Sequence, residues 1–366
     1  MTHALRVGIV GTGWGALVHG PAYSIVAGYE LTAICARNPE RLARTAESLG
    51  VAQTATDWQE FVRRDDLDVI SVAVPVELHH PITLAALDAG KHVLCEKPLA
   101  LTAAQAQEMV RAAEASGRAT ASCFELRWTP ERLPVWDLAR QGFFGTPYFS
   151  RMAQSAGYWH PTHRPQSAWM YDVDRGGGYL AGMLSHDIDW VCAMFGDPVE
   201  VCADVHTTVP KVTLADGTVM DVTADDTATL IMRLASGARA EIGASVVGAH
   251  THGYRFEVFG SEGTAVLTSS RGRTHELAVG AATDDALSPW SGTPREPLSR
   301  PDLPSRGAST MIRGMALMLE DWLPALRGGP SSAPTFRDGW RVQAVIEAAR
   351  ASSAGAGWVP VRLEEQ

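Results

Sequence analysis

The stretch LRVGIVGTGWGALVHGPAY, residues 5–23, decides the fold of the first part of this chain. A β-rich run leads into a glycine-rich turn, and a helical pattern follows. Gly11 would allow a tight turn, Gly13 would let the backbone approach a pyrophosphate, and Ala16 would allow close helix–strand packing. With Trp14, these residues predict a dinucleotide site at a helix N-terminus. Alone, the G-x-G-x-x-A pattern also fits an ordinary turn of small residues.

The same alternation of strands and helices continues to about Cys123. It predicts a doubly wound parallel sheet with right-handed crossovers. Val69–Val74 is almost entirely apolar, as in a parallel strand covered on both faces. In such a sheet the ligand lies at the carboxyl ends of the strands. The residues expected at that edge are Pro75, Glu77, His79, Glu96 and Lys97.

The end of the second strand bears on the choice of cofactor. NAD-preferring proteins usually carry an acidic residue there, which accepts the ribose hydroxyls. This chain has Ala36 and Arg37 instead. A guanidinium can bind a 2′-phosphate that a carboxylate would repel. We therefore expect NADP or NAD as the cofactor, with NADP favoured; a solvated loop charge is the alternative interpretation of Arg37.

At Glu96-Lys97-Pro98 the sequence resembles the glucose–fructose oxidoreductase/inositol dehydrogenase (Gfo/Idh/MocA) family. The similarity continues through FELRWTP, GGGYL, HDIDW, FEVFGSEGTAVL and FRDGWRVQAVIEAAR, and so covers nearly the whole chain. The resemblance implies an NAD(P)-dependent dehydrogenase or reductase acting on CH–OH groups of a sugar, cyclic polyol or sugar derivative. A redox-neutral sugar lyase or glycosidase with a retained NAD(H) is the alternative, and a non-catalytic nucleotide-binding sensor is a third.

Two residues suit the chemistry of hydride transfer. The reaction needs a positive charge where the alkoxide develops and a base for the hydroxyl proton. Lys97, at the carboxyl end of a strand, suits the first task, and the resemblance assigns it to substrate binding and catalysis. An imidazole, with an ordinary pKa of about 6.5, suits the second. On sequence alone a single helical histidine such as His186 is more often structural, but the resemblance implies that His186 is the catalytic base.

Further substrate contacts are expected around these two residues. Arg127 matches a family segment near nicotinamide and substrate. Trp159 and Trp169 belong to an aromatic loop of the kind that stacks on sugars, although core packing or a subunit contact also explains Trp169. His160 and His163 have no second ligand pair, and no Cys-x-x-Cys motif occurs, so no metal site is predicted.

Gly182 departs from the family pattern. The family usually has an Asp four positions before the histidine, one helical turn earlier. Glycine there predicts a bulkier substrate, or one without the hydroxyl that the Asp would read; the alternatives are helix packing and a family register that differs by one helical turn. The candidates for a replacement carboxylate are Asp172, Asp174 and Glu125.

After Phe124 the pattern changes to segments with a period of two, separated by turn pairs. They predict an α+β domain with a large, mostly antiparallel open sheet. We expect residues 1–123 to form the dinucleotide-binding domain and 124–366 the substrate-binding and oligomerisation domain. The resemblance implies a homodimer or homotetramer through this sheet. Residues 271–309, rich in Pro, Gly and Ser, predict an irregular excursion.

The composition narrows the classes of partner. The net charge of −10 over 366 residues, without a basic run, argues against a nucleic-acid partner. No apolar run approaches ~18 residues, so no membrane span is expected. The five cysteines are scattered, as in a reduced compartment, and the first strand begins too early for a cleavable leader. We expect a cytoplasmic protein that handles small molecules.

Overall fold

The computed structural model describes residues 3–165, 168–270, 274–293, 295 and 308–363. Its contacts divide the chain into two compact units. The first comprises Met1–Arg132 and Pro294–Trp340, and the second comprises Leu133–Thr293 and Arg341–Gln366. Residues 124–132 and the helical part of 308–340 thus join the first unit, whereas the sequence boundary placed them in the second domain. A helical pattern shows that one face is covered, but not which core covers it.

The first unit is built on a six-stranded sheet with the order β3-β2-β1-β4-β5-β6. Every neighbouring pair is parallel, so the predicted doubly wound sheet is confirmed. The central strand β4 is buried along its whole length, as its apolar sequence predicts. The strands are β1 (Leu5–Val10), β2 (Tyr29–Cys35), β3 (Gln53–Ala55), β4 (Val69–Val72), β5 (His92–Cys95) and β6 (Thr120–Ser122).

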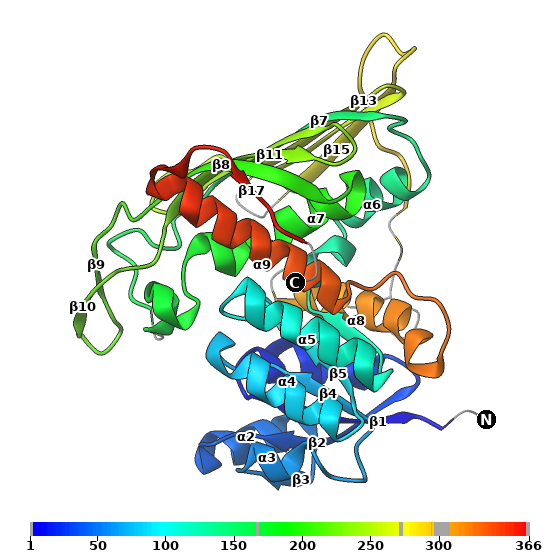
Figure 1. The fold of residues 1–366 in the computed structure, drawn as a ribbon, viewed down its shortest axis with the longest axis vertical. Helices are drawn as coiled ribbons and strands as arrows, with labels where there is room; N and C mark the ends of the chain where they lie inside the picture. Colours follow the sequence, from blue (N-terminus) through cyan, green and yellow to red (C-terminus); the bar gives the residue numbers. More distant parts are fainter. Residues whose placement is uncertain (1–2, 166–167, 271–273, 294, 296–307, 364–366) are drawn as a thin grey trace. The chain divides into compact units, whose positions relative to one another are not determined.

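Helices and helical turns connect these strands. Figure 1 shows α4 and α5 side by side over the sheet, whereas α8, from much later in the chain, packs against α1 and η3. Asn38 caps α2 by accepting the N–H of Arg41, and Gly50 ends it in the left-handed conformation. The elements are η1 (Gly15–His19), α1 (Gly20–Ile25), α2 (Pro39–Leu49), α3 (Trp58–Phe61), η2 (Val76–Leu78), α4 (His79–Asp88), α5 (Ala103–Ser116), η3 (Glu125–Trp128), α8 (Ala308–Trp322) and η7 (Ala325–Arg327).

The second unit contains a nine-stranded sheet with the order β16-β15-β14-β13-β7-β12-β11-β8-β17. Only the β7–β12 pair is parallel among the described strands, so the predicted mostly antiparallel sheet is confirmed. A separate hairpin pairs β9 with β10. The strands are β7 (Pro147–Ser155), β8 (Pro198–His206), β9 (Lys211–Thr213), β10 (Val219–Asp221), β11 (Thr227–Leu234), β12 (Arg239–Ser245), β13 (Gly253–Gly260), β14 (Gly263–Ser270), β15 (Thr274–Ala281), β16 (Ser288–Pro289) and β17 (Val359–Pro360).

Helices cover one face of the large sheet. In β11 the residues Ala228, Leu230 and Met232 are fully buried, whereas Thr229 and Ile231 between them are exposed. Figure 1 shows α6 and α7 on the covered face, where α7 contacts β7 and β12. The elements are α6 (Leu133–Arg140), η4 (Trp169–Tyr171), η5 (Val173–Arg175), η6 (Leu180–Leu184), α7 (Ser185–Phe195), α9 (Phe336–Ala351, divided between the units after Trp340) and η8 (Ser352–Ala356). None of the helices in the described ranges has the length and hydropathy to cross a bilayer.

The irregular excursion predicted for residues 271–309 is wrong in part. Strand β15 pairs with β14 along its whole length and β16 pairs with β15. Ala308 begins α8. Residues 271–273, 294 and 296–307 lie outside the described residues. Strand β15 forms because the edge of β14 offers hydrogen-bond partners to its backbone. The content of Pro, Gly and Ser over a long window cannot predict such a tertiary pairing.

Candidate functional site

The turn after β1 requires glycine at Gly11. Its φ is +119°, and its N–H donates to the carbonyl of Cys35 at 2.9 Å. A Cβ at this position would lie 2.0 Å from the carbonyl oxygen of Ala73, at the end of β4. Gly11 is therefore needed both for its dihedral angle and for the close approach of two strand ends.

The next residues leave room above the backbone. A Cβ on Gly13 would meet only the Nη2 atom of Arg41, at 4.0 Å, among the described residues. The indole of Trp14 is 39% exposed. Within the described chain, the N–H groups of Gly13 and Trp14 have no hydrogen-bond acceptor. Open space with free N–H donors before a helical segment is the arrangement that binds a phosphate group.

The close helix–strand packing lies at Gly15 and not, as predicted, at Ala16. A Cβ on Gly15 would lie 2.9 Å from Cγ2 of Ile9, whereas Ala16 is only half-buried. The physical reason is the form of the first turn. Gly15–His19 is a π-helix, whose i to i+5 hydrogen bonds change which residue faces the strand.

Two arginines lie beyond the end of β2. Arg37 is exposed, so its guanidinium is accessible to a ligand phosphate. Arg41, on α2, donates from Nη2 to the carbonyl of Thr12 at 3.1 Å, within the glycine turn. Sequence reasoning missed Arg41, because only the return of α2 toward the turn brings it there.

His79 joins the loops that follow β4 and β5. Its Nε2 lies 2.8 Å from the carbonyl of Val74, and its Nδ1 lies 3.0 Å from that of Pro98. Burial lowers the pKa of His79 in spite of these backbone contacts, so the ring is neutral near pH 7 and donates to one of the two carbonyls. The residue predicted to bind cofactor therefore also fixes the loop that carries Lys97. Pro75, which precedes η2, is half-buried beside it.

Glu96 is anchored from two sides. Its carboxyl is 7% exposed; Oε2 accepts the N–H of Lys97 at 3.0 Å, and Oε1 lies 2.9 Å from Nε2 of His19. The other ring nitrogen of His19 lies 2.8 Å from Oγ of Ser71. Since an ionised carboxylate only accepts, Nε2 of His19 donates to Glu96.

Electrostatics keep Glu96 ionised. Burial alone would raise its pKa, but the hydrogen bond and charge of His19, together with the Lys97 cation, lower the pKa below its ordinary value. Lys97 itself is half-buried at the carboxyl end of β5. An ionised, buried carboxylate thus holds the backbone of Lys97. The conformation of the Lys97 side chain then determines where its ammonium group lies.

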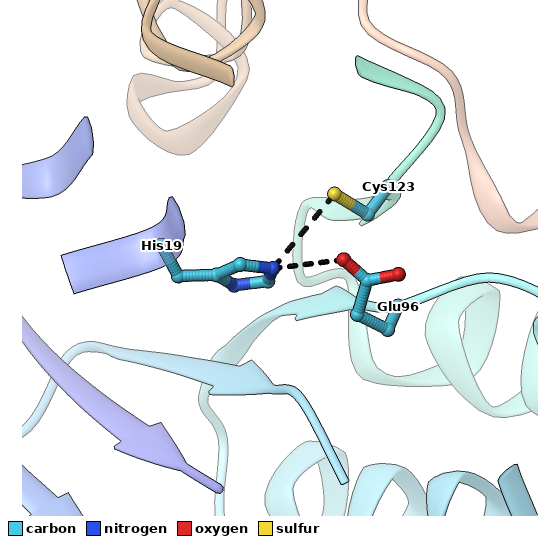
Figure 2. Close-up of side chains that lie close together, drawn as sticks. All are labelled: His19, Glu96 and Cys123. Carbon is cyan, nitrogen blue, oxygen red and sulfur yellow. Dashed lines mark hydrogen bonds and ion pairs between the residues drawn. The ribbon is translucent and has the colours of Figure 1, made fainter. Parts of the chain in front are cut away.

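His19, Glu96 and Cys123 form a buried trio whose ligand atoms all lie within 4.8 Å of one another. Figure 2 shows the thiol and the carboxylate converging on Nε2 of His19. Such a set could in principle hold a metal ion. However, the direct hydrogen bond between His19 and Glu96 accounts for their proximity, and all three side chains are enclosed in the core. We interpret the trio as a hydrogen-bond network, and the absence of a metal stays a prediction.

Arg127 and Trp128 are held within the first unit. Arg127, on η3, is 4% exposed, and its Nη2 lies 3.4 Å from Oδ1 of Asp338 at the start of α9. Trp128 is fully buried and donates from Nε1 to Asp321 on α8 at 2.8 Å. These contacts fix η3 against two helices from the end of the chain. The structure therefore gives Arg127 a fixed, paired position.

In the second unit, His186 lies in the first turn of α7 and is 3% exposed. The preceding segment, Leu180–Leu184, is a π-helix and not the regular α-helix that the sequence predicts. A step of four residues therefore does not complete one turn there. A Cβ on Gly182 would meet no atom within 4 Å among the described residues, so packing does not require glycine. Asp189 is fully buried on the same helix.

A residue that sequence reasoning missed, Asp225, fixes the start of this segment. Its Oδ2 accepts the N–H of Leu180 at 2.6 Å, and its backbone carbonyl accepts the N–H of Tyr179 at 2.8 Å. A Cβ on Gly178, whose φ is +111°, would lie 2.3 Å from Oδ1 of Asp225. One of the three consecutive glycines is thus required by contact with a buried carboxylate. Burial raises the pKa of Asp225.

The aromatic loop is divided between core and surface. Trp159 is buried and lies against Tyr171, with ring centroids 4.3 Å apart. Trp169 is half-buried, His160 is half-buried and His163 is exposed. Trp159 therefore packs in the core beside Tyr171 and does not offer an open face. Trp169 keeps an accessible edge. The other candidate carboxylates, Asp172 and Asp174, are half-buried and exposed respectively.

The candidate residues thus form one group in each unit. The first unit brings together the glycine turn, His79, Glu96 and Lys97 at the carboxyl ends of its strands. The second places Gly182 and His186 on one helical segment. The residues missed are His19, Arg41 and Asp225. In the sequence, each of the three is only a charged or imidazole residue among small ones. Many surface positions have the same surroundings, so this pattern does not identify a site residue.

Comparisons with known proteins agree with this organisation. The sequence model of the oxidoreductase family with an NAD-binding Rossmann fold matches residues 5–123, and that of the GFO/IDH/MocA C-terminal domain matches residues 135–266. Levoglucosan dehydrogenase of Pseudarthrobacter phenanthrenivorans is 28% identical, over 98% of this chain and 98% of its own. Myo-inositol 2-dehydrogenase of Thermotoga maritima is 28% identical, over 73% of this chain and 79% of its own.

Among solved structures, levoglucosan dehydrogenase in complex with NADH superposes with a TM-score of 0.86. It is 26% identical and covers 98% of this chain and 100% of that chain. The two family models match the whole parallel sheet of the first unit and strands β7 to β13 of the second. The chain is a member of the GFO/IDH/MocA family of oxidoreductases, with an NAD-binding Rossmann fold.

Proposed function

We propose that this oxidoreductase transfers a hydride between a nicotinamide cofactor and a secondary alcohol or ketone of a sugar, cyclic polyol or sugar derivative. The observation that carries the proposal is the setting of Lys97. Its backbone is fixed by the buried carboxylate of Glu96, and its ammonium group follows the strand end where a doubly wound sheet binds its ligand. Named relatives that act on levoglucosan and myo-inositol support the substrate class.

In this proposal the glycine turn and the neighbouring strand ends hold the cofactor. Gly13 and Trp14 would receive the pyrophosphate on free N–H groups at the turn that Gly11 allows, and Pro75 and Glu96 would line the edge beside it. When bound, the nicotinamide supplies the hydride acceptor. Exposed Arg37 supports NADP(H) as the preferred cofactor. The NADH complex of a relative shows that the fold also accepts the other form.

Lys97 and His186 would divide the proton and charge chemistry. The Lys97 cation would stabilise the oxygen as its proton leaves, and His186 would accept that proton or return it. Trp169, with an exposed edge, would contact the substrate, whereas Trp159 would support the loop. The open space at Gly182 supports a larger substrate than those that family members bind with an Asp at this position.

We also propose that the uncovered face of the nine-stranded sheet joins copies of the chain into a homodimer or homotetramer. Ile231 and Phe259 on this face are exposed, and Phe149 and Phe259 stack with centroids 6.3 Å apart. A broad face that carries such residues is expected to be covered by a second copy. Sedimentation of the wild-type chain and of Ile231→Lys tests it. The proposal requires an oligomer that the variant weakens, and a monomeric wild type would refute it.

The function is tested by screening sugars and polyols with NAD and NADP separately, while nicotinamide reduction and product formation are both followed. The proposal predicts one reduced cofactor for each oxidised substrate. Product without net cofactor reduction would instead identify a redox-neutral enzyme. Cofactor binding without any turnover across the panel would favour a nucleotide-binding sensor.

A further inference from the structure

Glu125 is a buried acid beside the network of His19, Glu96 and Cys123. Its side chain is 1% exposed at the start of η3. The thiol of Cys123 lies 3.5 Å from Oε2 of Glu125 and 3.9 Å from Nε2 of His19, which in turn contacts Glu96. Figure 2 shows the thiol on the side of His19 that also faces Glu96. One thiol thus connects two buried carboxyl groups.

The two carboxyl groups have unequal hydrogen-bond donors. Glu96 receives an N–H from His19 and another from the backbone of Lys97. The side chain of Glu125 has the thiol of Cys123 as a weak donor, besides its own backbone N–H. When two carboxyl groups share a buried site and only one is well solvated by donors, the other keeps its proton.

We propose that Glu125 carries a proton at neutral pH and acts as a positioning residue for the charge of Lys97. While Glu125 is neutral, the ammonium group of Lys97 keeps its full effect on the substrate oxygen. When Glu125 ionises, a second carboxylate competes for that ammonium group and weakens its effect. The inference rests on the proposed role of Lys97 in hydride transfer.

The electrostatics of the cluster support this assignment. Burial raises the pKa of Glu125 to about 8, and the negative charge of Glu96 adds to the rise, while Lys97 opposes it. The charge of Lys97 acts on the pKa of both carboxyl groups, so the three groups lie in one electrostatic neighbourhood. Burial also raises the pKa of Cys123, which keeps the thiol protonated and uncharged.

Other elements enclose Glu125. On α8, a Cβ at Gly314 would lie 2.8 Å from the carbonyl oxygen of Glu125, and Met315 lies 3.6 Å from the thiol of Cys123. The titratable and charged groups on the surrounding elements are Glu96 and Lys97 after β5, His19 on η1, Tyr23 on α1, Cys123 after β6, Arg127 on η3, Arg313 on α8 and Asp338 on α9.

The first experiment measures the proton without any need for activity. Denaturant unfolding is followed from about pH 6 to about pH 9 for the wild type, Glu125→Gln and the control Glu114→Gln, which removes an exposed acid of the same unit. An acid whose folded pKa is raised stabilises the fold at low pH and loses this stabilisation as pH rises through the folded pKa. As the pH rises, the denaturant midpoints of the wild type and of Glu114→Gln should therefore fall relative to the midpoint of Glu125→Gln. Parallel curves for all three proteins would overturn the proposal.

An infrared titration of the wild type covers the case in which Glu125→Gln does not fold. The absorbance of protonated carboxyl groups should fall as the pH rises through the pKa of about 8 expected for Glu125. A spectrum that does not change across this range would contradict a proton on Glu125.

The second experiment measures the pH profile of kcat/KM for hydride transfer. The wild type and Glu114→Gln should lose activity on the alkaline side, by about tenfold one unit above the pKa. Glu125→Gln should keep its activity through the same range. An identical alkaline loss in all three would refute the positioning role. The unfolding curves could separate as expected while none of the proteins transfers hydride. That result would confirm the proton on Glu125. It would refute both the proposed function and the positioning role.

Discussion

His19 and Glu96, 77 residues apart in the chain, are joined by a contact of 2.9 Å between Nε2 and Oε1 in the core of the first unit. The contact ties the first helical turn after β1 to the loop that carries Lys97. Since Oε2 of Glu96 accepts the backbone N–H of Lys97, one side chain connects the helical segment after the proposed phosphate-binding turn with the proposed catalytic lysine. The backbone position of Lys97 therefore depends on a histidine that contacts neither ligand in our account.

Replacing His19 with Ala should destabilise the protein strongly. The change removes the donor to a buried carboxylate, and a hydrogen bond to a charged group contributes about 1.5–3 kcal/mol to the free energy of unfolding. His80→Ala is the matched control, because His80 pairs with Glu108 at 2.8 Å near the surface, where such a pair contributes about 0–1 kcal/mol. Denaturant unfolding measures both. Equal losses in the two variants would show that the buried contact has no special role.

Replacing Arg37 with Ala should shift the cofactor preference from NADP(H) toward NAD(H). A charge-assisted contact with the 2′-phosphate contributes about 1.5–3 kcal/mol, which corresponds to roughly a 10- to 150-fold rise in the KM for NADP(H). Arg44→Ala, an exposed arginine on α2, should leave both KM values unchanged. Initial rates with each cofactor test this. If the wild type uses both cofactors equally and the variant does too, Arg37 is a solvated loop residue.

Two substitutions at Gly182 separate space from charge. A Cβ at this position meets no atom within 4 Å among the described residues, so Gly182→Ala should leave the free energy of unfolding unchanged or raise it by up to about 1 kcal/mol. Gly182→Asp should lower kcat/KM for the native substrate more than Gly182→Ala does, through steric and charge conflict, while cofactor affinity is kept. Steady-state kinetics and calorimetry give these values. Unchanged kinetics in Gly182→Asp would place this residue away from the substrate.

Much of the fold could be predicted from local patterns. The order of strands and helices up to Cys123 specified the parallel sheet, and the period of two specified the second sheet. Gly11 was predictable because its turn needs a positive φ. Helix α9 was recognisable as a helix, but its division between the two units was not, because an apolar helix face does not state which core it covers.

The contacts within the candidate site were less predictable. His19, Glu96 and Cys123 come from three distant segments, and only the parallel pairing of β1, β4, β5 and β6 brings those segments together. The π-turn before α7 escaped prediction, because the sequence LAGML carries no signal that distinguishes i to i+5 from i to i+4 bonding. Asp225 was missed for the same reason as His19: its role depends on a backbone N–H 45 residues away.

The most direct test of the account is the rate of nicotinamide reduction by Lys97→Met with a sugar or polyol that the wild type oxidises. We predict that reduction falls to background, while calorimetry shows cofactor affinity close to that of the wild type. Met keeps an unbranched side chain of similar length and removes the charge and N–H donors that stabilise the alkoxide. Lys211→Met, which removes an exposed lysine of the second unit, should keep the wild-type rate. Near-normal turnover in Lys97→Met would contradict the central claim.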